Sequence, residues 1–172
     1  MYRYGHYGAA LLVYSPLAAL TIVLGFDELA LLGGLAAVGL SMAPDVDIRL
    51  PGVRHRGPTH TVAFAVLIGA GVAALVGVLA TGETPLASML PVETTAGVAL
   101  TVVFAFLVGT LSVLSHILAD ALTPMGVTPF WPASSRHYSY SITRAANPLA
   151  NYALFGIGVI AAIAAASLGS LP

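Results

Sequence analysis

The chain contains no cysteine and no lysine, and only 8% of its 172 residues are charged. The absence of cysteine excludes disulfides, thiolate metal sites and cysteine nucleophiles. The net charge of −1 does not suggest direct nucleic-acid binding by a basic surface. Soluble domains carry about 25% charged residues, so this chain has too little polar surface to coat a water-soluble globule.

Hydrophobic residues are abundant instead, at 58% of the chain. This composition predicts an all-α polytopic membrane protein that forms a single integral membrane domain over residues 1–172. The first apolar segment is long enough to span and lacks the cleavage site of a signal peptide, so it is expected to remain as a helix. Five transmembrane helices are predicted, at about 7–25, 28–43, 61–80, 96–122 and 152–169.

Small residues recur along one face of the third and fifth predicted helices. They are Gly69, Ala73 and Gly77 in the third, and Gly158, Ala162 and Ala166 in the fifth. Such surfaces let helices approach closely in lipid. Chance in a chain rich in alanine and glycine explains them equally well.

Five spans place every arginine on one side of the membrane: Arg3, Arg49, Arg54, Arg56, Arg136 and Arg144. The other side carries only acids, namely Asp27, Glu28, Glu83 and Glu93. The positive-inside rule therefore predicts a multi-pass protein of the cell (inner or cytoplasmic) membrane. Its N-terminus and arginine side face the cytoplasm, and its C-terminus faces out.

The histidines also belong to the arginine side. They are His6, His55, His60, His116 and His137. At 1.5 Å per residue, Asp45 and His116 reach about the same inner edge of a ~30 Å hydrocarbon core at which His6 and His60 begin their helices. Ionisable groups at such depths are functional candidates. The alternative is that these ionisable residues only mark helix ends. That would explain one or two of them, but it explains poorly why four separate segments place such residues at one depth.

Two acidic motifs strengthen the functional interpretation. His116 and Asp120 are four residues apart and share a helix face. In "PDVD", Asp45 and Asp47 point the same way if the segment is extended. Two aspartates after an apolar helix need a cation or an arginine partner, so a salt bridge to Arg49, Arg54 or Arg56 is the competing explanation.

The stretch "HRGPTH" precedes the third predicted helix. Gly57 permits a tight turn, Thr59 is expected to cap the helix, and the turn directs His55 and His60 toward one point. A metal site is the favoured interpretation, and ligands without sulfur suit zinc, with manganese or iron as alternatives. The candidates exceed one tetrahedral ion, so either two ions bind or some residues support the ligands. The predicted metal ligands are His6, Asp45, Asp47, His60, His116 and Asp120.

These motifs resemble those of the YdjM-like family of inner-membrane metal-dependent hydrolases, which is also described as LexA-binding. The resemblance covers most of the chain, through "APDVD", "HRGPTH" and the long block "SHILADALTPMGVTPFWP". Thr61 stands where the family usually has serine. Carried over by position, the family motifs mark His6, Asp45, Asp47, His55, Arg56, Gly57, Thr59, His60, His116, Asp120, Thr123, Pro124, Gly126, Trp131 and Pro132.

The leading hypothesis is a membrane-bound metal-dependent hydrolase that acts on a phosphoester of a lipid or lipid-linked substrate at the cytoplasmic leaflet. Asp47 or another aspartate that supports the ligands is the expected base, Arg54 or preferably Arg56 would hold phosphate, and His55 is a further catalytic candidate. An aromatic loop either covers the site or forms an ordinary interfacial belt; it contains Phe130, Trp131, Tyr138 and Tyr140. One alternative, implied by the family label, is a non-catalytic anchor that recruits a LexA-like cytoplasmic regulator. A metal-ion transporter ranks last, because the spans offer few polar residues at mid-depth.

Overall fold

A computed structural model describes residues 1–80, 90 and 93–170 of the protein. Within this part of the chain, five helices are long and apolar enough to cross a membrane, and the predicted all-helical fold is confirmed. The helices are α1 (Arg3–Val23), α2 (Asp27–Leu40), α3 (Val62–Ala80), α4 (Thr95–Ala121) and α5 (Pro148–Ser167), and the second membrane-crossing segment continues past α2 to Arg49. Glu83, one of the acids predicted on the outer side, lies outside the described residues.

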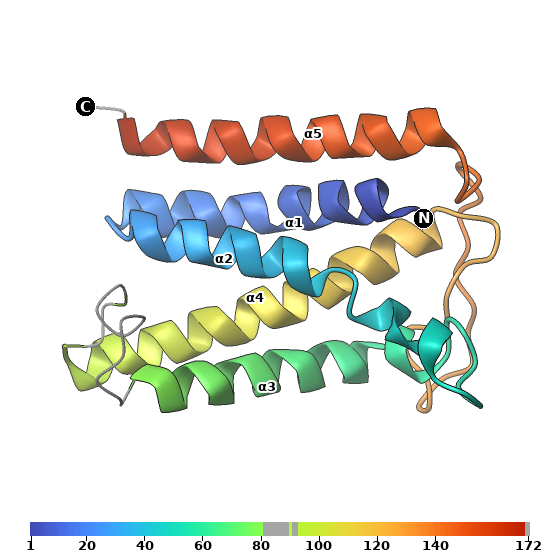
Figure 1. The fold of residues 1–172 in the computed structure, drawn as a ribbon, viewed down its shortest axis with the longest axis horizontal. Helices are drawn as coiled ribbons and strands as arrows, with labels where there is room; N and C mark the ends of the chain where they lie inside the picture. The colour runs from blue at the N-terminus through green and yellow to red at the C-terminus, as the bar shows by residue number, and fades with distance from the viewer. Residues whose placement is uncertain (81–89, 91–92, 171–172) are drawn as a thin grey trace.

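The helices pack as an elongated bundle (Figure 1). α1 lies between α5 and α2, while α4 contacts α1 and α2 and also packs along α3. Tyr14, Ala37 and Val108 form a buried cluster where α1, α2 and α4 meet. α4 therefore joins α3 to α1 and α2, and side chains on its last turns can reach all three of these helices.

Both surfaces of small residues form helix contacts. A Cβ atom added to Gly158 would overlap the backbone of Gly8, so α5 approaches α1 as closely as two backbones can. A Cβ atom on Gly109 would likewise crowd the backbone of Gly69, where α3 meets α4. Close packing of this kind substitutes for the hydrophobic effect, which does not drive helices together in lipid. Gly69 and Gly158 are therefore required by the helix contacts, whereas Ala166 is exposed.

The helix ends differ from the predicted ones in ways that local chemistry explains. α5 begins at Pro148, earlier than predicted, because the Asn147 side chain accepts a hydrogen bond from the Ala150 amide and Pro148 occupies the first helical position. α2 already ends at Leu40, and Pro44 instead begins a 3-10 helix, η1 (Pro44–Arg49). The segment around Asp45 and Asp47 is thus helical. It does not have the extended conformation considered from the sequence.

A second 3-10 helix, η2 (Pro58–His60), leads into α3. The cap of α3 is Thr61, whose hydroxyl accepts a hydrogen bond from the Phe64 amide. The prediction that Thr59 caps this helix is wrong, because the Thr59 hydroxyl donates to Asp47 instead. The N-terminus, η1, η2, the end of α4 and the start of α5 all gather at one end of the bundle (Figure 1). We call it the site end.

Candidate metal centre

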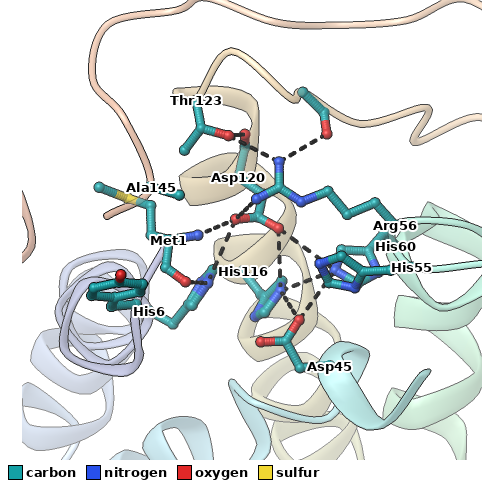
Figure 2. Close-up of polar contacts among 12 residues, drawn as sticks. Met1, His6, Asp45, His55, Arg56, His60, His116, Asp120, Thr123 and Ala145 are labelled. Atoms are coloured by element: carbon teal, nitrogen blue, oxygen red, sulfur yellow. Dashed lines mark hydrogen bonds and ion pairs between the residues drawn. The ribbon is translucent and has the colours of Figure 1, made fainter. Parts of the chain in front are cut away.

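The predicted ligands meet at the site end, although they come from four separate segments (Figure 2). α1 contributes His6, η1 contributes Asp45, and η2 contributes His60. His116 and Asp120 come from the last turns of α4, where their spacing of four places both side chains on one face. His6, His60, His116 and Asp120 are at most 1% exposed, whereas Asp45 is 18% exposed on its side chain.

The orientation of His116 is fixed by the backbone of α2. Its Nδ1 lies 2.7 Å from the carbonyl oxygen of Ser41. Because a carbonyl can only accept, Nδ1 carries the proton and Nε2 presents a lone pair. In most metal-binding histidines, the ring nitrogen that does not bind the metal makes a hydrogen bond of this kind, and this bond orients the ring.

His60 is held in the same way by a carboxylate. Its Nδ1 lies 3.3 Å from an oxygen of Asp47 and 3.0 Å from the Thr59 hydroxyl, which itself donates to Asp47. Nδ1 is therefore the protonated nitrogen, and Nε2 is free to bind a cation. Burial lowers the pKa of His60 below its ordinary value, more strongly than the neighbouring carboxylates raise it. The imidazole is thus neutral, the form that metals bind.

Four acceptor atoms converge as a result. The Nε2 atoms of His60 and His116 are 3.2 Å apart, and in the neutral tautomers set by their Nδ1 contacts both present a lone pair. One oxygen of Asp45 lies 3.5 and 3.4 Å from these two nitrogens, and one oxygen of Asp120 lies 3.6 Å from each. Lone pairs and carboxylates gathered this closely repel one another unless a cation lies among them.

The spacing matches that of a metal's ligands. Ligand atoms bound tetrahedrally at about 2.0–2.1 Å lie roughly 3.3–3.4 Å from one another. The nitrogen–nitrogen separation and the four nitrogen–oxygen separations lie between 3.2 and 3.6 Å. His60, His116 and Asp120 therefore form a group that could hold a metal ion, and Asp45 forms a separate group with His55 and His60.

His6 and the second oxygen of Asp120 extend the cluster. The His6 ring stacks on His116, with the ring centroids 3.7 Å apart. His6 Nε2 donates to the Met1 carbonyl oxygen, while its Nδ1 is buried without a hydrogen-bond partner among the described residues. With Asp45 and His116 it forms a further group of potential ligands. The amino group of Met1 bonds to Asp120 Oδ1, so Asp120 directs Oδ2 toward the histidine Nε2 atoms and Oδ1 toward positive charge.

Asp47 supports the ligands and does not lie among the four acceptors. It is 2% exposed, and its oxygens accept from His55 Nδ1, the Arg56 amide and the Thr59 hydroxyl. The HRGPTH turn does bring His55 and His60 together, with ring centroids 5.4 Å apart. A Cβ atom on Gly57 would crowd the Arg54 carbonyl, so the turn is tight there as predicted, but Arg56 is the residue with a positive φ, of 59°.

The side chain of Arg56 makes contacts within the protein. Its guanidinium donates to Asp120 Oδ1 at 2.9 Å, to the Thr123 hydroxyl at 2.9 Å and to the Gly126 carbonyl at 3.2 Å. These bonds tie the HRGPTH turn to the end of α4 and to the turn that follows it. Among the described residues neither Asp45 nor Asp47 forms a side-chain ion pair with an arginine, so that competing explanation of the two aspartates does not hold there.

A pocket of about 330 Å³ opens beside the cluster. Its lining includes Arg54, His55, Trp131 and His137. The aromatic loop thus contributes Trp131 to a pocket wall, while Tyr140 is exposed. His137 shares the pocket but is in none of the ligand groups formed by the described residues.

The sequence did not reveal Ser41 or Met1, because Ser41 contributes a backbone carbonyl and Met1 its carbonyl and terminal amino group, and no side-chain type signals these contacts. Thr123 lies within the family motif, but nothing else in the sequence indicated that it would accept a hydrogen bond from Arg56.

Together these features define a membrane protein that has five long helices over its described residues and a buried histidine–aspartate centre that could bind a metal ion. The chain belongs to the YdjM inner membrane protein family, whose model matches residues 1–171. No curated protein and no solved structure matches the chain.

Proposed function

We propose that the protein is a metal-dependent hydrolase of phosphoesters in lipid or lipid-linked substrates. The observation that carries this proposal is the convergence of two imidazole lone pairs and two carboxylate oxygens at separations of 3.2–3.6 Å. A structural role alone would not require so many unprotonated acceptors to face one another at such a cost.

Zinc is the metal that we propose, because imidazole nitrogens and carboxylate oxygens without sulfur suit it; manganese and iron are the alternatives. A divalent cation held there supplies Lewis-acid polarisation of a phosphoryl oxygen and acidifies a water molecule. Its charge of +2 would offset the charges of Asp45 and Asp120.

The proton from the attacking water would pass to His55, as we infer from its contacts. Asp47 holds its Nδ1 proton at 3.0 Å, which leaves Nε2 as an acceptor, and the ring is half-buried at the pocket wall. Asp47, which we also predicted to be the base, is buried with both oxygens engaged, so its contacts favour a supporting role. Those of Arg56 favour positioning of Asp120, while the exposed Arg54 lines the pocket and is free to bind an anion.

We place the site end in the cytoplasm because all six arginines belong to the side on which it lies. A cysteine introduced at Ser134 should be protected from an impermeant thiol reagent in intact cells and should react after permeabilisation. A cysteine at position 83 should react in intact cells. The reverse pattern would put the site outside.

The test of activity is hydrolysis of a lipid-like phosphodiester in detergent by purified, metal-loaded protein. Chelation and His116→Ala should each reduce turnover by at least ~100-fold, since either removes the cation. Leu118→Ala is the matched control, because Leu118 lies on the same turns of α4 but is 57% exposed.

Activity that survives both chelation and His116→Ala would refute the proposed site. Metal-loaded protein that is inactive on a panel of esters, amides and phosphoesters would favour a non-catalytic anchor for a LexA-like regulator.

A further inference from the structure

A second pocket reaches the candidate metal centre from the other side of Asp45, between α1 and η1. Its volume is about 390 Å³, and its lining includes Arg3, Tyr7, Asp45 and Arg49. Asp45 is the one member of the four-acceptor set with appreciable exposure, at 18% of its side chain. A molecule in this pocket would therefore lie against an accessible edge of the ligand set.

The two arginines in this pocket are available to a ligand. Both are exposed, and neither forms an ion pair within the part of the chain that the structure describes. Two guanidiniums beside a cation site form a strong anion-binding arrangement, and phosphate suits it because it accepts paired hydrogen bonds from arginine. A cation among the ligands would also offset the repulsion between an anion and Asp45.

An apolar groove lies next along the same pair of helices. The pocket at Asp45 includes Tyr7 on α1 and Gly39 on α2, and the groove begins with Leu11, one turn further along α1, and with Val38, the neighbour of Gly39 on α2. It has a volume of about 480 Å³, and it runs along α1 as far as Ile22. The seam between α1 and α2 therefore changes from basic to apolar with depth.

The α1–α2 seam is open at Gly39, near the pocket at Asp45, whereas at Gly33 α2 closes on Tyr14 of α1. A Cβ atom on Gly39 would meet nothing within 4 Å, whereas one on Gly158 or Gly109 would strike a neighbouring backbone. From Leu11 to Ile22 the groove covers about 17 Å at 1.5 Å per residue. Half of a ~30 Å hydrocarbon core is about 15 Å, so the groove can take a chain as long as one leaflet is thick.

We infer that this seam binds a membrane lipid phosphoester, with the phosphate between Arg3 and Arg49 beside Asp45 and a hydrocarbon chain in the groove between α1 and α2. The inference rests on the proposed function and names the place where the substrate would bind beside the candidate metal centre. A soluble phosphate ester would use the arginines but not the groove. A protein partner would have to displace lipid along a seam that lies within the predicted spans.

The test is photolabelling in phosphatidylcholine nanodiscs by a trace of phosphatidic acid that carries a diazirine midway along one acyl chain. In metal-loaded protein, labels should concentrate on peptides of α1 and α2. Gly39→Phe should reduce this labelling about tenfold by filling the passage, and Arg3→Gln/Arg49→Gln should reduce it similarly. Phosphatidylcholine with the same diazirine measures labelling by surrounding lipid.

Two controls separate blockage from misfolding. Gly39→Ala adds only a methyl group and should label normally. Gly71→Phe adds the same ring to α3 at another position where a Cβ atom meets nothing within 4 Å, and it should also label normally. The arginine pair tests the inference independently if Gly39→Phe does not fold.

The labelling result stands apart from the activity result. Labels spread evenly over the helices, or unchanged by both Gly39→Phe and the arginine substitutions, would overturn the seam even if metal-dependent hydrolysis occurs elsewhere. Labels concentrated in the seam of a protein that hydrolyses nothing would support the lipid site and refute the hydrolase.

Discussion

The membrane-embedded middle of the bundle and its site end are stabilised by different physical means. In the middle, backbones meet at Gly8 and Gly158, and at Gly69 and Gly109. At the site end, buried polar groups such as His116 are oriented through specific hydrogen bonds. The contrast separates two requirements on the sequence: the middle needs small side chains at helix contacts, whereas the site end needs particular donors and acceptors.

The largest effect is expected when ligands are removed from the site end alone, which tests whether the two regions are independent. His60→Ala/His116→Ala should abolish metal binding, because it removes two of the four converging acceptors. Helix content should change little, since the contacts between helices in the middle are intact. Metal content by mass spectrometry and circular dichroism in detergent provide the two measurements.

His137→Ala is the control for this variant, because His137 is an exposed histidine outside the ligand groups. It should keep its metal. Full occupancy in the double variant would show that the metal binds elsewhere.

The converse experiment alters the middle. Gly158→Leu forces a side chain into the Gly8 backbone and should destabilise the protein by at least the ~1–3 kcal/mol typical of overpacking. Gly156→Leu, two residues earlier on α5, enters open space and should have little effect. Thermal unfolding in detergent measures both. Equal stability of the two variants would mean that α1 and α5 are not in close contact.

A smaller effect is expected from Asp47→Asn, which tests the support of the ligands. Asp47 contacts His55 and His60 but is not one of the converging acceptors. Loss of such a partner typically weakens metal affinity by about 10–100-fold. Competition with a chromogenic chelator measures the affinity, and complete loss of metal would instead identify Asp47 as a ligand.

Much of this fold could be predicted, because hydrophobic length and composition specify membrane helices directly. The depth of His6, His60 and His116 also followed from counting residues. The conformation of the PDVD segment could not be predicted, because proline is equally compatible with an extended chain and with the start of a 3-10 helix. The division of labour between Asp45 and Asp47 depends on that local turn.

The roles of neighbouring residues in HRGPTH were also beyond pattern reasoning. Thr59 and Thr61 are chemically alike, and only the position of Asp47 decides that the first supports the site while the second caps α3. Arg56 was expected to face a substrate, and the turn after α4 lies close enough to engage it instead. Such choices depend on tertiary proximity that one sequence does not display.

The convergence of Asp45, His60, His116 and Asp120 also has a topological consequence. The bilayer constrains each span but places no direct constraint on the segments between spans. A cation at this point would join the end of α2, the entry to α3 and the end of α4, and so close the loops that connect them. The entropic cost of closing a loop grows only slowly with its length. Closing the long connection through α3 would therefore cost little more than closing the short connection between α2 and α3. In a chain without cysteine, one ion would thus provide the crosslink that a disulfide provides elsewhere.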